Sequence, residues 1–398
     1  MDKKTKKGIY LDYSATTPVD RAVLREMVPF FGQNYGNASS IHKPGQEALF
    51  AIDNAREAVA DFLECRREEV IFTGSATESN NMAISGTAQK ALKKGKIHII
   101  TSDIEHDAVL SPIKNLEKRK DVSATYLPAG EKGIINVREL RKAIRKETIL
   151  VSIIYANNEI GTIQPIKEIG EIVREENKKR GPEKKILFHI DAVQAANYLN
   201  CKVDHLGVDM LSISGHKIYG PKGIGVLYLR RGTSIEPIIF GGGQENGLRS
   251  GTENVPGIVG IGAAVELIKK RKKFNAKTEQ LRNKLIEGVL ERTENTRVNG
   301  CLQNRLPNNV NFSFKGAEGE SIVMALDQEG FYLSTGSACS SKSLEPSHVL
   351  MAIGLSREEA HCSLRISLGR ETREEDIDRL LEVLPGVVKR LRKISGRK

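Results

Sequence analysis

Short runs of apolar residues alternate along the chain with longer stretches in which apolar positions recur every three or four residues. The short runs are apolar at successive positions, as in strands that are buried on both faces of a parallel sheet. They predict strands at 70–73, 97–101, 149–155, 186–190, 210–214 and 225–229. The stretches between them predict helices at 48–63, 78–93, 137–145 and 166–178. Strands that alternate with helices predict an α/β fold with a largely parallel sheet.

The pattern changes after a Gly-rich stretch at 241–243. A long amphipathic helix is predicted over 259–293, and the remainder predicts two strands and a last helix, at 309–314, 364–368 and 374–393. We therefore predict a large domain over 21–258 and a smaller α+β domain over 259–398. We expect the segment 1–20 to pack with the smaller domain.

The composition is that of a globular, non-secreted protein. Of the 398 residues 39% are hydrophobic and 28% charged, which excludes wholesale disorder. No apolar run approaches the ~20 residues of a transmembrane helix, and the first residues lack the apolar core of a signal peptide. The five cysteines are widely spaced and form no Cys-x-x-Cys motif, which argues against a disulfide scaffold or structural zinc. We expect a cytoplasmic protein with no membrane attachment.

The net charge of +11 is concentrated at the two ends. Nine of these charges lie within residues 2–7 and 389–398, and a further basic cluster lies at 269–273. A DNA-binding domain carries its basic residues on folded elements. We interpret the ends as solvated tails and expect no specific nucleic-acid partner; a patch for an acidic partner is the alternative.

Polar residues follow the predicted strands, at the edge where open α/β sheets bind ligands. The first strand leads into a turn, 74–79, whose free N–H groups could bind a phosphate or form an ordinary helix cap. Glu105-His106 and Asn157-Asn158-Glu159 follow two others. Asp191 ends another strand and would be costly to bury unpaired, so we expect it to face a cation. A metal site on His189 and Asp191 is the weaker alternative, and we predict none.

Lys217 stands in the most specific segment, 212–223, where a strand ends in a Ser-Gly-His turn. A partly desolvated lysine there can have a lowered pKa and form a Schiff base, whereas a surface loop lysine is the alternative. The chain contains no Walker A, Gly-x-Ser-x-Gly or Gly-x-Gly-x-x-Gly motif, so nucleotide hydrolysis, serine hydrolysis and dinucleotide binding lack their signatures.

Two further residues stand out in the smaller domain. Cys339 is surrounded by small polar residues, which suits an exposed loop more than a structural thiol. Arg365 lies inside an apolar strand and requires an anionic partner, either a ligand carboxylate or a structural ion pair.

Taken in order, these motifs resemble those of the cysteine desulfurases, in the class V branch of the pyridoxal-phosphate aminotransferases. The resemblance runs from about Tyr10 to Arg392 and rests on the segments 11–18, 76–81, 105–106, 157–161, 189–192, 214–217, 249–252 and 337–340. It implies the pyridoxal-phosphate-dependent transferase fold type I: a mostly parallel seven-stranded sheet flanked by helices, plus a smaller α+β C-terminal domain. The longer Cys-bearing loop looks like that of the subgroup that feeds iron–sulfur cluster and thiolation pathways.

The resemblance implies an activity with residue roles. L-Cysteine would be converted to L-alanine with pyridoxal 5′-phosphate as the cofactor, and the sulfur would pass to Cys339 as a persulfide. Lys217 would carry the cofactor and His106 would stack on its ring. The other ring, phosphate and cofactor contacts would come from Asp191, Gln194, Ala76, Thr77, Ser214, His216 and Asn157, and from Thr252 of the partner subunit. The substrate carboxylate would be held by Asn157 and Arg365.

The resemblance also implies a homodimer and an iron–sulfur scaffold or other sulfur-acceptor protein as partner. Two alternatives stay open on the sequence alone. A selenocysteine lyase or aminotransferase could use the same fold, although an aminotransferase has no evident need for Cys339. A noncatalytic protein that binds RNA through its basic ends would have no bound chromophore.

Overall fold

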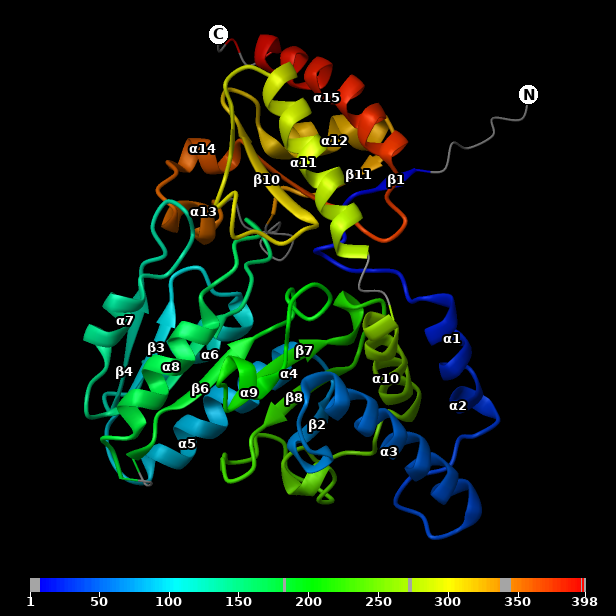
Figure 1. Ribbon diagram of the computed structural model, residues 1–398, viewed down its shortest axis with the longest axis vertical. Helices are drawn as coiled ribbons and strands as arrows, with labels where there is room; N and C mark the ends of the chain where they lie inside the picture. The colour runs from blue at the N-terminus through cyan, green and yellow to red at the C-terminus, as the bar shows by residue number, and fades with distance from the viewer. Residues whose placement is uncertain (1–7, 182–183, 271–273, 337–344, 395, 397–398) are drawn as a thin grey trace.

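A seven-stranded sheet forms the frame of the larger of two bodies (Figure 1). This computed structural model describes residues 8–181, 184–270, 274–336, 345–394 and 396. The strand order is β2-β8-β7-β6-β5-β3-β4. The strands are β2 (Val70–Thr73), β3 (Ile97–Ser102), β4 (Val122–Leu127), β5 (Thr148–Ile154), β6 (Leu187–Asp191), β7 (Met210–Ser214) and β8 (Gly225–Leu229). Neighbouring strands are parallel, except that β8 is antiparallel to both β2 and β7.

The six strands predicted from the larger body's sequence are confirmed within one residue at each end. The strand β4 was missed because it lies at the sheet edge, where the middle residues Ser123 to Tyr126 are not fully buried. Such an edge strand lacks the continuous apolar run of a central strand. The sheet is mostly parallel, as predicted, but no pattern distinguished the antiparallel β8.

Helices cover both faces of this sheet and enclose two apolar cores. One core includes Ile52, Ile169 and Ile261 from α3, α8 and α10, and the other includes Met82 and Ile113 from the α4–α6 side. The helices of the larger body are α1 (Arg21–Met27), α2 (Pro29–Gly32), α3 (Lys43–Leu63), α4 (Ala76–Asn81), α5 (Thr87–Leu92), α6 (Asp107–Leu116), α7 (Val137–Ala143), α8 (Ile166–Asn177), α9 (Val203–Leu206) and α10 (Val255–Lys270).

The smaller body is built on a three-stranded antiparallel sheet. In it β10 (Asn309–Phe314) lies between β9 (Thr296–Val298) and β12 (Ser363–Ser367). Phe312 and Phe314 from this sheet pack with Leu285 and Leu384 in a separate apolar core. The helices are α11 (Phe274–Arg292), α12 (Gly319–Gln328), α13 (His348–Ala352), α14 (Arg357–His361) and α15 (Glu374–Ile394). Among all the helices that the structure describes, none is both long enough and apolar enough to cross a membrane.

The start of the described chain packs with the smaller body before it enters the larger one. β1 (Ile9–Tyr10) pairs in parallel with β11 (Phe331–Tyr332), and Leu11 is buried in the smaller body's core. Figure 1 shows the chain passing from β1 down to α1 on the larger body.

Two helices occupy the region where the sequence predicts one over 259–293. α10 packs against α3, and its residues Ile258 and Ile261 belong to the core of the large sheet. α11 packs against α15 in the smaller body, and residues 271–273 lie outside the described chain. Because α10 is buried with the large sheet, we place the change of body after Lys270 and not at residue 258.

The close contact of α10 with α3 gives a stability prediction. A Cβ added to Gly262 would lie 2.8 Å from both Cα and Cβ of Ala55, so Gly262→Ala must push the helices apart. We expect it to lower the free energy of unfolding by ~1–3 kcal/mol, as overpacking does. The matched control is Gly386→Ala in α15, where a Cβ meets nothing within 4 Å. That variant should gain ~0.5–1 kcal/mol. Equal effects of the two variants in denaturant unfolding would contradict the packing argument.

Candidate active site

A cavity of about 480 Å³ lies where the carboxyl ends of the large sheet face the smaller body. The segments that follow β2, β3, β5, β6 and β7 form one side of its wall. Gly336, residues 345–348 and Arg365 of the smaller body form the other. The strand-end residues singled out in the sequence therefore meet in one place, as expected for an α/β sheet. Those that line the cavity are Ala76, Thr77, His106, Asp191, Gln194, Ser214, His216, Lys217 and Arg365.

Lys217 ends a 3₁₀ turn, Gly215–Lys217, directly after β7. Its Nζ donates hydrogen bonds to the backbone carbonyls of Ser14, at 2.5 Å, and Ala15, at 2.7 Å. The turn requires glycine at position 215, because a Cβ there would lie 2.8 Å from the carbonyl oxygen of Pro221. The amine is thus held in the cavity wall by the N-terminal segment and is only partly exposed.

Asp191 at the end of β6 is a buried carboxylate in the same wall. Asn80 donates to its Oδ2 at 2.8 Å, and the backbone N–H of Val193 donates to its Oδ1 at 3.0 Å. Within the described residues it has no ion-pair partner. A buried carboxylate bound only by neutral donors favours a cationic group in the cavity beside it.

The turn that opens α4 supplies an anion-binding end to the cavity. Ser75 caps the helix, and Ala76 and Thr77 in its first turn line the cavity together with Ser214 and His216. β8 approaches this turn so closely that a Cβ on Gly225 would lie 2.5 Å from the carbonyl carbon of Ser75. Free N–H groups at a helix start combined with side-chain donors suit a phosphate.

The ring of His216 is neutral at pH 7. Burial is the main cause that lowers its pKa to about 4, and the charges of Lys217 and Lys222 lower it further. Its Nδ1 lies 3.1 Å from Oγ1 of Thr16 in the N-terminal segment. A neutral imidazole can donate one ring N–H to an anionic ligand without carrying a buried charge.

His106 caps α6 and so presents its ring in a fixed orientation. Its Nδ1 accepts a hydrogen bond from the backbone N–H of Ala108 at 3.0 Å, while the ring lines the cavity. The preceding Glu105 is fully buried, and its Oε1 accepts from Oγ of Ser102 at 2.5 Å and from the N–H of Ile154 at 2.8 Å. Burial raises the pKa of Glu105 to about 8, so the carboxyl group is mainly protonated at pH 7.

The side chain of Asn157, predicted to contact the cofactor and the substrate carboxylate, is not among the residues that line the cavity. Its Nδ2 donates to the carbonyl of Ile104, and its Oδ1 accepts from the N–H groups of Glu159 and Ile160. These bonds turn the chain after β5, so that Asn158 and Glu159 line the cavity instead. Asn157 therefore shapes this wall, and its side chain is committed to the backbone.

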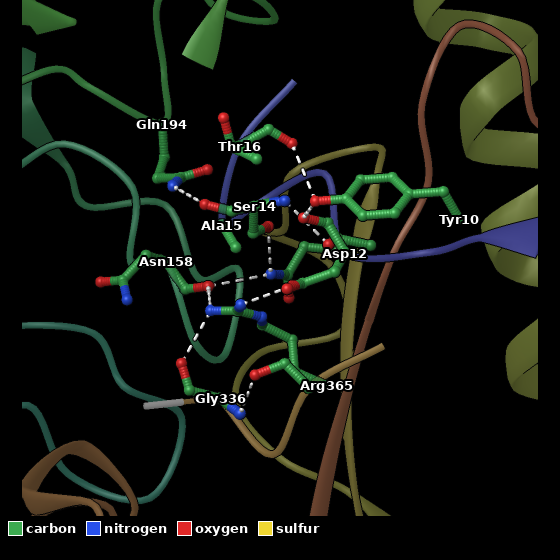
Figure 2. Close-up of polar contacts among 12 residues, drawn as sticks. Tyr10, Asp12, Ser14, Ala15, Thr16, Asn158, Gln194, Gly336 and Arg365 are labelled. Atoms are coloured by element: carbon green, nitrogen blue, oxygen red, sulfur yellow. Dashed lines mark hydrogen bonds and ion pairs between the residues drawn. The ribbon is translucent and has the colours of Figure 1, made fainter. Parts of the chain in front are cut away.

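Arg365 lies in the wall formed by the smaller body (Figure 2). Its side chain is 2% exposed. Its Nη2 forms an ion pair of 2.7 Å with Oδ1 of Asp12. Its Nη1 donates to the carbonyls of Gly336, at 2.7 Å, and Asn158, at 3.1 Å. Of the two partners that the sequence left open, the structure shows the internal ion pair, and the guanidinium still borders the cavity.

Two further predicted site residues, besides Asn157, are not placed in this cavity. Thr252 lies in a separate hollow beside Gly74 and Arg249. Its segment is fixed by the ion pair of Arg249 with Glu78, at 2.7 Å, and by that of Glu245 with Arg56, at 2.8 Å. Cys339 lies outside the described residues, although the flanking residues 336 and 345 line the cavity.

The alternative of a metal at His189 has no support in the described part of the chain. Ser152 and Ser212 contact its Nδ1 and Nε2 at 2.8 and 3.1 Å, so both ring nitrogens are used. Burial lowers the pKa of His189 to about 3. Within the described part of the chain, no cluster of His, Cys, Asp and Glu side chains could hold a metal ion.

Sequence reasoning missed several residues that shape the site. Asp12, Ser14 and Ala15 bind the two cations, and Ser347 donates to Glu159 at 2.6 Å across the cavity wall. The motif at 11–18 was the available signal, but it carried no assigned role. Its partners lie hundreds of positions away in the sequence.

Comparisons with known proteins agree on what this chain is similar to. A model of the family described as aminotransferase class-V matches residues 9–380. The chain is 51% identical over 391 residues to cysteine desulfurase IscS of Dictyoglomus turgidum, covering 98% of this chain and 97% of that protein. It is 50% identical over 390 residues to that of Methanosarcina thermophila, covering 98% and 94%.

Solved structures give the same result. A NifS-like protein, 39% identical, matches with a TM-score of 0.88 over 96% of this chain and 99% of that one. SspA in complex with cysteine, 42% identical, matches with a TM-score of 0.80 over 90% of this chain and 98% of that one.

The raised pKa of Glu105 predicts a pH-dependent stability. The folded-state pKa of Glu105, about 8, lies above its ordinary value of 4.5. Its protonated form therefore contributes fully to the free energy of unfolding below about pH 4.5, and this contribution is lost as the pH rises through 8. Glu105→Gln cannot ionise. We expect the unfolding temperature of the unmodified protein to fall between pH 6 and pH 9 by about 2–4 °C more than that of the variant. The exposed Glu131→Gln is the control, and equal falls for all three proteins would contradict the prediction.

Proposed function

The chain belongs to the aminotransferase class-V family and is a cysteine desulfurase, and from that premise we propose how its cavity performs the reaction. L-Cysteine is converted to L-alanine, and the sulfur passes to Cys339 as a persulfide. The observation that carries this proposal is the meeting of Lys217, Asp191, His106 and Arg365 in one cavity with an anion-binding turn. Each of these groups has a task in removing sulfur from an amino acid.

The residues present fit pyridoxal 5′-phosphate. The Asp191 carboxylate, which has no ion-pair partner in the described chain, matches a protonated pyridine nitrogen. The Lys217 amine matches the aldehyde. The first turn of α4, together with Ser214 and His216, supplies hydrogen-bond donors for the phosphate. When bound there, the cofactor supplies an electron sink for negative charge at the substrate α-carbon.

The chain's own groups bind the substrate and move its protons. Arg365 is the cation that receives the substrate carboxylate. Lys217 takes the proton from the α-carbon as general base, and the carbonyls of Ser14 and Ala15 stabilise the ammonium group that results. Asp191 would keep the ring nitrogen protonated, and His106, whose ring accepts a hydrogen bond from the N–H of Ala108, would stack on the ring and relay protons.

The sulfur transfer uses the thiolate of Cys339 as nucleophile. An S–S bond forms between Cys339 and the substrate sulfur while the Cβ–S bond of the substrate breaks. The electron pair of the broken bond stays with the carbon skeleton, which takes up protons and leaves as alanine. The persulfide keeps the transferred sulfur for an acceptor.

Replacing Lys217 and replacing Cys339 should stop the reaction at different steps. Lys217→Ala should reduce alanine production from L-cysteine to background, because the amine that holds the cofactor and serves as the general base is lost. Cys339→Ala should also give no alanine, yet it should still show the change in cofactor absorbance on addition of L-cysteine. Cys65→Ala is the control for a thiol that lies outside the cavity. Unchanged alanine production by Cys339→Ala would contradict its role as acceptor.

We also propose a homodimer in which Thr252 completes the phosphate site of the other subunit. Thr252 lies outside the cavity of its own chain. Large apolar side chains are exposed along α1, α2 and the region up to α3, and exposed apolar patches of this kind mark interfaces. They are Leu24, Val28, Phe31, Tyr35, Ile41 and Phe50. Figure 1 shows these helices together at one side of the larger body.

Subunit hybrids test the position of Thr252. Thr252→Ala should weaken cofactor binding by about tenfold, because one hydrogen bond to a charged group is lost. Co-expression with Lys217→Ala chains should restore wild-type affinity at one site of each hybrid dimer, since that site receives an intact Thr252 from the Lys217→Ala chain. Purified hybrids that show no restored site would place Thr252 in its own chain's site.

We propose that the enzyme acts in the cytoplasm and passes its sulfur to an iron–sulfur scaffold or a thiolation acceptor. The cysteines among the described residues are free thiols, as a reducing compartment favours.

A further inference from the structure

The guanidinium of Arg365 is held on several sides by protein groups before any substrate arrives. Figure 2 shows it between the carboxylate of Asp12 and the carbonyls of Asn158 and Gly336. The three partners use both hydrogens of Nη1 and one of Nη2. The Nε–H has no partner among the described residues. The Nε atom is itself buried, so the donor left for a ligand is the second hydrogen of Nη2, and Arg365 borders the cavity.

Asp12 binds this guanidinium from outside the cavity. Arg365 lines the cavity, whereas Asp12 does not. Its carboxylate is 16% exposed and has Arg365 as its ion-pair partner. A substrate carboxylate therefore does not have to replace Asp12 in order to approach the Nη2 hydrogen that remains. Both carboxylates can be bound by the same planar group, one on each side.

The same segment that carries Asp12 also holds the catalytic lysine. Ser14 and Ala15 accept hydrogen bonds from Lys217, and Ser14 also accepts from Nε2 of Gln194 at 2.9 Å. The hydroxyl of Tyr10 closes the turn by donating to the carbonyls of Asp12 and Thr16. Residues 12–16 thus contact both Arg365, the proposed cation for the substrate carboxylate, and Lys217, the proposed cofactor lysine.

We propose that Asp12 is a positioning residue that gives the enzyme its preference for amino acids over amines without a carboxylate. It does so by fixing the plane of Arg365, so that the remaining Nη2 hydrogen reaches the substrate carboxylate. The proposal rests on the proposed role of Arg365. Without Asp12, the guanidinium keeps its two carbonyl contacts but loses its charged one, and it can rotate away from the carboxylate. Binding of the amine part of the substrate does not depend on Asp12.

L-Serine and ethanolamine provide the test, because they differ in the carboxylate alone and carry no sulfur that could be removed. Their dissociation constants are measured by titration of the cofactor-loaded enzyme, followed by the absorbance of the cofactor. The dissociation constant of ethanolamine divided by that of L-serine gives a ratio that reports recognition of the carboxylate. We expect Asp12→Ala to lower this ratio by about tenfold or more, through weaker binding of L-serine at unchanged ethanolamine binding.

The controls separate positioning from a general effect on folding. Asp12→Asn retains an oxygen that accepts from Nη2, and its ratio should stay within about threefold of the wild type. Tyr10→Phe loosens the same turn without touching Arg365 and should leave the ratio unchanged. In the double variant with Arg365→Ala, Asp12→Ala should lower the ratio no further than Arg365→Ala alone, because both act through one contact. Unfolding temperatures identify any variant that fails to fold, and Asp12→Asn remains informative in that case.

Several outcomes would overturn the inference. Equal losses for L-serine and ethanolamine in Asp12→Ala, or the same loss of the ratio in Tyr10→Phe, would show a structural role only. A fully additive double variant would show that Asp12 acts elsewhere. If Arg365→Ala lowers the ratio and Asp12→Ala does not, the inference alone is wrong. If Arg365→Ala keeps the wild-type ratio, the proposed carboxylate site is wrong as well.

Discussion

Two cations, Lys217 and Arg365, lie in one largely buried space, and the same short segment near the N-terminus binds both of them. A buried cation is stable only when charged or polar groups surround it. Here the carboxylate of Asp12 and the carbonyls of Ser14 and Ala15 provide these groups. The segment can reach both because β1 packs on the smaller body and the chain then crosses to the larger one. The geometry of the site therefore depends on the docking of the two bodies.

The sheet supplies the remaining groups at its carboxyl edge. Lys217, Asp191 and His106 each follow a different strand, and the strands fix their spacing because neighbouring backbones are tied by hydrogen bonds. Close backbone contacts at Gly215 and Gly225 bring the lysine turn and the anion-binding turn against the sheet.

The pattern of apolar residues was sufficient to predict those elements whose burial is visible in their own short stretch of sequence. Central strands are apolar on both faces and were found, whereas the half-exposed edge strand β4 and the antiparallel direction of β8 were not. Lys217 and Asp191 stood out in the sequence because each lies at the end of a predicted strand. The sequence analysis chose Asn157 and gave Asn158 no role, because no local pattern shows that the turn bonds the first side chain to the backbone and puts the second on the cavity wall. The pairing of Asp12 with Arg365 joins positions 353 residues apart, and no local signal predicts it.

The most direct test of the central claim is the stoichiometry of the reaction. The purified protein is saturated with pyridoxal 5′-phosphate and incubated with L-cysteine under a reductant, and alanine and sulfide are quantified together. Desulfuration predicts equal amounts of the two products, because each C–S bond broken yields one alanine and the reductant releases one sulfide from each persulfide. The absence of alanine from folded, cofactor-loaded protein, or the release of a keto acid in its place, would contradict the account.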